Sequence, residues 1–188
     1  MRGCPGGAAS WTALIVALLL APGVTAFPLS AQTEEGVKVA ALNSLLSFVR
    51  WPPGEHQTGD VTIAVLGAGP LESALDVLEG RTVFGRPIRV VRYESLAEVG
   101  HPHILFIGAA ASGRLREALV VARERSILTV GETADFTADG GAMSLRFPRG
   151  TLEITLNECA FQDAGLEASS RLSRLSELMC SGNAREGC

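Results

Sequence analysis

The chain has 188 residues, with 20 acidic and 16 basic side chains for a formal net charge of −4, and 47% of its residues are hydrophobic. This length suits one domain with a complete hydrophobic core. The acidic balance and the lack of a dense basic cluster argue against nucleic acid as a partner.

The N-terminal segment, residues 1–31, is typical of a secretory signal peptide. Arg2 supplies a positive charge, and an apolar core followed by small residues comes next. This core is shorter than the roughly 20 apolar residues that cross a bilayer, although a retained membrane anchor is the alternative. Cleavage after Ala26 or after Ala31 fits the pattern, and Ala31 is preferred because the polar residues after it open a helix. We therefore expect residues 32–188 to be exported as one domain.

Cysteines that remain after the predicted cleavage are candidates for a disulfide: Cys159, Cys180 and Cys188. Export would bring these cysteines into a compartment where disulfides can form. The short polar segment between Cys180 and Cys188 favours pairing of these two, with Cys159–Cys180 as the main alternative. The spacing lacks the CxxC pattern of redox and zinc sites, so structural cysteines are expected. Residues 181–188 are expected to form a flexible tail.

The first element of the exported domain is predicted to be a helix over residues 34–49. It ends before Pro52 and Pro53, because proline cannot continue a helix. Apolar residues extend around this helix, so it is either buried on two sides or presents a surface to a second molecule. The interface candidates on the second face are Leu42, Leu46 and Val49.

Apolar runs and amphipathic helical patterns then alternate along the chain. Strands are predicted over residues 61–66, 87–93, 103–107 and 127–130. Helical patterns are predicted over residues 70–79 and after Ser112, which is expected to cap its helix. Uninterrupted apolar strands that alternate with helices indicate a largely parallel sheet with both faces covered.

The C-terminal part has a different pattern. Residues 142–147 and 151–156 are separated by three residues, which predicts an antiparallel hairpin. Asn157 is expected to cap a short helix that ends at Gly165. The predicted fold class is α/β, with a mixed, largely parallel β-sheet covered by helices on both faces and a C-terminal antiparallel hairpin.

Two polar groups are the candidate ligand- or partner-binding residues. Arg50 and Trp51 follow the first helix, where a guanidinium can bind a carboxylate or phosphate and an indole can stack on a ligand. Ser169, Ser170 and Arg171 form the second group, in which hydroxyls and a guanidinium would complete a pocket. The alternative is that Trp51 fills the core and that one of the serines only caps the last helix.

Patterns typical of enzymes are incomplete. The Gly67–Gly69 turn follows a strand, but Glu72 stands where a dinucleotide-binding loop has its third glycine. The sequence contains no G-x-S-x-G nucleophile motif. His101 and His103 are two imidazoles, whereas a metal site usually needs three or four ligands. We therefore expect no catalytic residue, no metal and no cofactor.

A family resemblance is carried by motifs spread over nearly all of the exported domain. They include Phe48-Val49-Arg50-Trp51-Pro52, Val65-Leu66-Gly67, Gly85-Arg86-Pro87-Ile88, His103-Ile104-Leu105-Phe106-Ile107, Leu128-Thr129-Val130-Gly131, Gly140-Gly141-Ala142-Met143, Ile154-Thr155-Leu156-Asn157 and Ser169-Ser170-Arg171-Leu172. In this order and spacing they resemble the YfiR-like periplasmic proteins. The resemblance implies an α/β periplasmic regulator, often dimeric, that represses an inner-membrane diguanylate cyclase by binding its periplasmic region. Pro102 departs from the family, because many relatives have a cysteine there that forms a disulfide.

The expected function is therefore that of a non-enzymatic periplasmic regulatory protein. Its expected partner is an inner-membrane sensor or diguanylate cyclase, bound through the periplasmic region, and a homodimer is a further expectation. One alternative is a periplasmic protein that binds an amino-acid-like or aromatic acid ligand through Arg50 and Trp51. A second alternative, a hydrolase, is disfavoured by the missing nucleophile motif.

Overall fold

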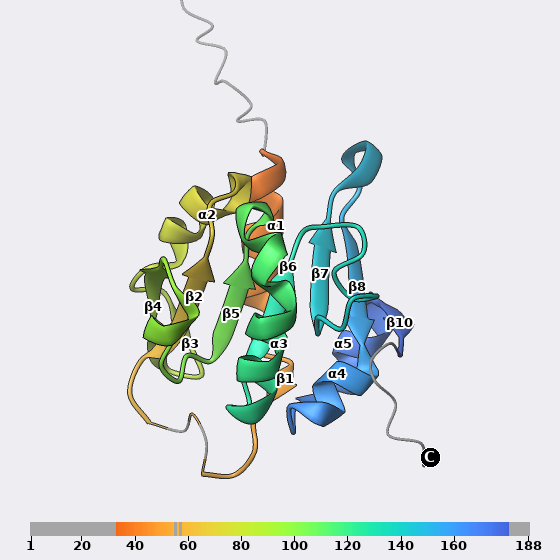
Figure 1. Cartoon of the computed structure of the whole chain (residues 1–188). Helices are drawn as coiled ribbons and strands as arrows, with labels where there is room; N and C mark the ends of the chain where they lie inside the picture. Colours follow the sequence, from red (N-terminus) through yellow and green to blue (C-terminus); the bar gives the residue numbers. More distant parts are fainter. Residues whose placement is uncertain (1–32, 55, 57, 181–188) are drawn as a thin grey trace, which may run out of the picture. The chain divides into compact units, whose positions relative to one another are not determined.

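The computed structural model of the protein describes residues 33–54, 56 and 58–180 (Figure 1). These residues all fall within one unit, Gln32–Cys188. The predicted signal peptide, residues 1–31, and the predicted tail, residues 181–188, lie outside the described residues. Within the part of the chain that is described, no helix is long and apolar enough to span a membrane.

A mixed sheet, eight-stranded among the described residues, has the order β10-β8-β7-β6-β5-β2-β4-β3. The strands are β2 (Val61–Leu66), β3 (Thr82–Val83), β4 (Arg86–Tyr93), β5 (Ile104–Ile107), β6 (Leu128–Gly131), β7 (Met143–Arg146), β8 (Glu153–Asn157) and β10 (Glu177–Met179). Strands β4, β2, β5, β6 and β7 are parallel to one another, and β8 pairs with β7 as the predicted antiparallel hairpin. At the sheet's two ends, β3 pairs antiparallel with β4, and β10 runs parallel to β8. The predicted fold class is confirmed.

Helices cover both faces of this sheet. They are α1 (Glu34–Leu46), α2 (Pro70–Ala74), α3 (Leu115–Glu124), α4 (Glu158–Asp163) and α5 (Ser170–Leu175). Alternate side chains of β2 enter two separate cores, because successive residues of a strand point to opposite faces. Ile63 and Val65 join the core that α1, α2, α4 and α5 complete, while Ala64 and Leu66 join the core under α3. Figure 1 shows α1 behind the central strands and α3 in front of them.

Short 3-10 helices connect several of these elements. They are η2 (Leu75–Leu78), η3 (Leu96–Glu98), η4 (Ala109–Arg114) and η5 (Pro148–Gly150). Ser112 lies inside η4, and α3 begins after Arg114 with no side-chain cap, so the predicted capping role of Ser112 is wrong. The reason is that the chain first forms the 3-10 turn η4, so α3 begins at Leu115, too far along the chain for Ser112 to be its N-cap.

The first helix is shorter than predicted. It ends at Leu46 instead of residue 49, and Val49–Arg50 forms the short strand β1. Strand β1 pairs antiparallel with β9 (Glu167–Ala168) in a separate two-stranded sheet. Helical periodicity alone continues to Val49, but these interstrand hydrogen bonds draw the last residues of the pattern into an extended backbone.

The turn after β2 that resembles a dinucleotide-binding loop has a packing role. Gly67 has a φ of +79°, and a Cβ added to it would lie 2.6 Å from the Cβ of Ala111. A Cβ added to Gly108 would lie 2.5 Å from the carbonyl oxygen of Gly67. These glycines are therefore required because the loops after β2 and β5 approach each other at backbone distance.

Candidate functional site

The two predicted binding groups meet at the small sheet formed by β1 and β9. Arg50 pairs in register with Glu167, and Val49 with Ala168. The backbone N–H of Ser169 donates to the carbonyl oxygen of Phe48 at 2.9 Å. Residues that lie far apart in the sequence are thereby brought side by side. We call this region, with Phe48, Arg50, Glu167 and Arg171, the β1–β9 surface.

The charged side chains of the β1–β9 surface are exposed to solvent. The side chain of Arg50 is 76% exposed, and its Nη1 lies 3.8 Å from Oε2 of the equally exposed Glu167. Such a pair contributes at most about 1 kcal/mol, so a competing carboxylate can replace Glu167 at small cost. The exposed Arg171 places its guanidinium carbon 5.5 Å from the centre of the Phe48 ring. This cation–π contact orients the charge while leaving it open to solvent.

Trp51 lies against the interior of the protein. Its ring is half-buried, packs on the core beneath α1, and makes edge-on contacts with His56, Phe84 and His103 at centroid distances of 6.4, 6.4 and 5.7 Å. The buried indole nitrogen has no hydrogen-bond partner among the described residues. The structure thus places Trp51 as a plug at the edge of the core, which is the alternative that the sequence left open.

Next to Trp51 lies a polar cluster that sequence reasoning missed. The guanidinium of Arg86 donates to the backbone carbonyls of His56 and Thr58 at 2.6 and 2.8 Å and lies 3.1 Å from Nε2 of His103. His103 is 5% exposed. Arg86 and His103 stand in motifs that carry the family resemblance, but their spacing in the chain contains no signal that they meet. This cluster anchors the loop before β2.

Serines of the second predicted group differ in their roles. Ser169 is the N-cap of α5, and its Oγ accepts a hydrogen bond from the backbone N–H of Leu172 at 3.4 Å. Ser170 is the first residue of the helix and is exposed. The structure therefore accounts for Ser169 by capping, and only Arg171 of this group contributes a charge to the surface.

The three residues predicted as interface candidates lie in the core. Leu42, Leu46 and Val49 are exposed by 0, 0 and 2%, respectively. They pack in the core under the sheet, Leu42 and Leu46 from the buried face of α1 and Val49 from β1. This corrects the interface prediction for these residues: their side chains are not available to a partner, and the alternative of burial holds.

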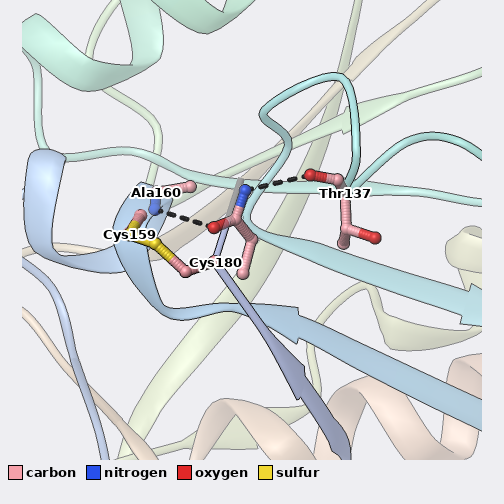
Figure 2. The surroundings of a disulfide bond; sticks show 5 residues. Thr137, Cys159, Ala160 and Cys180 are labelled. Carbon is pink, nitrogen blue, oxygen red and sulfur yellow. Dashed lines mark hydrogen bonds between the residues drawn. A yellow bond between two sulfur atoms is a disulfide. The ribbon is translucent and has the colours of Figure 1, made fainter. Parts of the chain in front are cut away.

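The disulfide joins Cys159 and Cys180, with 5.0 Å between the two Cα atoms (Figure 2). This pairing is the main alternative from the sequence, and it excludes the preferred pairing of Cys180 with Cys188, which itself lies outside the described residues. Cys159 stands in α4 and Cys180 directly follows β10. The bond therefore fixes the outermost strand of the sheet to the helix beside it.

Within the part of the chain that is described, no group of three or more metal-ligating side chains occurs.

Asn157, which lies beside this disulfide, supports a prediction about stability. Its fully buried side chain accepts from the N–H of Ala160 at 3.3 Å and donates to the carbonyl oxygen of Thr137 at 2.9 Å (Figure 2). Asn157→Ala is expected to lower the free energy of unfolding by about 2 kcal/mol, because it removes a helix cap and one of the two hydrogen bonds that the buried carbonyl of Thr137 accepts. Asn157→Ser keeps a capping oxygen and should lose less. Urea unfolding measures both changes, and equal losses would contradict the capping role.

Comparison with known proteins identifies the family of this chain. The YfiR/HmsC-like family model, a domain of previously unknown function, matches residues 35–177. The chain belongs to the YfiR/HmsC-like family. The resemblance carried by the sequence motifs is thus confirmed, and this is a family of non-catalytic regulators of diguanylate cyclases in the periplasm. No curated protein matches the chain.

Solved structures share the fold of this YfiR/HmsC-like protein. A conserved domain protein from Vibrio cholerae O1 biovar eltor superposes with a TM-score of 0.53 at 12% identity. The ABC domain in complex with L-Trp from Streptococcus pneumoniae superposes with a TM-score of 0.51 at 9% identity. Each match covers 78% of this chain but only 60% of the other chain. At these identities the likeness concerns the α/β fold alone.

Proposed function

We propose that this YfiR/HmsC-like protein is a non-enzymatic periplasmic regulator. It binds the periplasmic region of an inner-membrane signalling protein of the diguanylate cyclase type and represses or tunes the output of that protein. Family membership over residues 35–177 supports the class of function. The single structural observation that carries the proposal is the convergence of two exposed guanidinium groups on the β1–β9 surface, from segments that only the folded chain brings together.

The chemistry of this surface indicates what the partner supplies. Arg50 makes an exposed ion pair with Glu167, and Arg171 is oriented by the Phe48 ring. Arginine forks bind carboxylates in a bidentate manner, so an acidic segment of the partner fits this surface. Charges at the rim of an interface change the association rate and its salt dependence more than they change the final affinity. Binding is therefore expected to weaken as ionic strength rises.

Charge reversal tests the surface in cells. Arg50→Glu combined with Arg171→Glu is expected to weaken partner binding about tenfold or more, because two favourable contacts become repulsive. In-cell crosslinking followed by mass spectrometry of the recovered membrane proteins measures binding, and the cyclic di-GMP level measures the output. The matched control is Arg116→Glu, an exposed arginine on α3 on the opposite face of the sheet.

Two outcomes would count against the proposal at different levels. If wild-type protein recovers no inner-membrane signalling protein, the proposed function fails. If wild type recovers one but the double reversal behaves like Arg116→Glu, the function stands and the β1–β9 surface is not where the partner binds.

A further inference from the structure

A cavity lies beside the β1–β9 surface, among β8, α4, β9 and α5. It has a volume of about 290 Å³. Leu156, Phe161 and Leu166 form its apolar lining and are each at most 3% exposed. This size lies near the lower end of the range for small-molecule sites. The cavity therefore suits one small ligand with an apolar body.

The charged side chains at the rim of this cavity are all acidic. Glu158 and Glu167 supply carboxylates, Gln162 an amide and Ser173 a hydroxyl. No lysine, arginine or histidine is among the described residues that line it. An anionic ligand would meet two like charges here, whereas a cation would gain two acceptors without displacing a buried group. Charge complementarity thus selects a cationic ligand.

We propose that this cavity binds a small organic cation, an ammonium group carried on an apolar body. The body occupies the space over Leu156, Phe161 and Leu166, and the ammonium donates hydrogen bonds to the carboxylates of Glu158 and Glu167. This class differs from the amino-acid-like or aromatic acid ligand that Arg50 and Trp51 suggest in the sequence. The structure points away from those residues as the ligand site, because Trp51 is turned toward the core.

Glu167 connects this cavity to the β1–β9 surface. It lines the cavity and is also the residue whose carboxylate lies 3.8 Å from Nη1 of Arg50. An ammonium bound to Glu167 therefore competes with Arg50 for the same carboxylate and releases the guanidinium. If the proposed function holds, the ligand alters the charge that the surface offers to its membrane partner. Occupancy of the cavity thereby regulates the interaction.

Binding is tested on the purified protein without any membrane partner. The probe is phenethylammonium, followed through the backbone amide signals of Leu166, Ala168 and Ser173 in ¹⁵N-correlated NMR spectra. Phenylacetate, which has a similar apolar body and the opposite charge, is the ligand control. We expect saturable shifts of these signals with the amine and none with the acid.

Variants locate the site and test the competition. Glu158→Gln and Glu167→Gln, which change exposed side chains and preserve shape, should each weaken amine binding about three- to fivefold. Glu177→Gln is the matched control, because Glu177 is exposed on the adjacent strand β10 and does not line the cavity. Arg50→Ala should tighten amine binding about twofold, since it removes the competitor for Glu167.

Results that would overturn the proposal are distinct from those that affect the proposed function. Equal shifts with phenylacetate, or an unchanged dissociation constant in both glutamate variants, would refute the cation site. Weaker amine binding in Arg50→Ala would refute the competition. Loss of partner crosslinking with amine binding intact would refute only the function of the β1–β9 surface.

Discussion

Replacing Lys38 with methionine is expected to lower the free energy of unfolding by about 3 kcal/mol. Lys38 is the only lysine of the chain, lies in α1 and has a side chain that is 7% exposed. Its ammonium lies 2.7 Å from Oε1 of Glu132 and 2.5 Å from Oε1 of Glu34. Burial by itself lowers the pKa of Lys38, but its hydrogen bonds to Glu132 and Glu34 outweigh burial and raise the pKa above the ordinary value. The folded protein therefore holds a charged lysine at this position.

The expected loss comes from the carboxylate left behind. Methionine preserves the length and the apolar stem of lysine, but it leaves Glu132, whose side chain is only 16% exposed, without its cation. Glu34 is 47% exposed and returns to water at small cost. The contact joins α1 to the loop after β6, so its loss loosens two elements that are far apart in the chain.

Urea unfolding followed by circular dichroism measures this loss. Arg89→Met is the matched control, because Arg89 pairs with Asp60 at 2.8 Å while 61% exposed, and its loss should cost less than about 1 kcal/mol. The double variant Lys38→Met with Glu132→Leu should recover most of the stability, since it removes both charges together. Similar small losses for Lys38→Met and Arg89→Met would show that burial does not strengthen the Lys38 contact.

Acidification is expected to destabilise the protein by about 3 kcal/mol between pH 6.5 and pH 4 through His103. Burial, together with repulsion from His56 and Arg86, lowers the pKa of His103 from 6.5 to about 4, although a hydrogen bond with the His56 backbone opposes this. Between these two values the unfolded chain binds a proton that the folded protein does not. Stability due to His103 is therefore complete above about pH 6.5 and is lost as the pH falls toward 4.

The geometry around His103 explains why the folded protein resists this proton. The backbone N–H of Thr62 donates to Nδ1 at 3.1 Å, so the proton of the neutral ring lies on Nε2. Nε2 lies 3.1 Å from the carbonyl oxygen of His56, to which it donates. A second proton on Nδ1 would face the N–H of Thr62 and add a charge beside the guanidinium of Arg86.

A variant that does not titrate isolates this effect. Asparagine at position 103 retains an oxygen that accepts from Thr62 but carries no ionisable group. His103→Asn should be less stable than wild type at pH 7, and the difference should shrink steadily as the pH falls to 4. Chemical unfolding at a series of pH values measures it, with other titrating groups common to both proteins. A difference that stays constant with pH would rule out the assigned role of His103.

Local patterns were sufficient to predict much of the fold. The strand Val61–Leu66 was predicted with its observed bounds, because a continuous apolar run bounded by a glycine is a local feature. Asn157 caps its helix at the predicted position, and Ser169, one of the two serines predicted to begin the last helix, caps α5. Such signals involve atoms only three or four residues apart, so the order of the residues contains them.

Contacts between distant residues decided what the local patterns left open. Strands β1 and β9 have two residues each, too few for any periodicity, and they exist because each supplies hydrogen bonds to the other. Strand β10 carries Cys180 to Cys159, which settles the disulfide between two pairings that were both open in the sequence.

The candidate site follows this division. The sequence by itself determined the family, the alternation of strands and helices, and the presence of Arg50 and Arg171 as candidate residues. Only the tertiary structure placed Arg171 over Phe48, set Arg50 against Glu167 and turned Trp51 toward the core. The physical reason is that backbone preferences act between near neighbours, whereas burial and side-chain partners depend on which surfaces meet when the chain closes around its core.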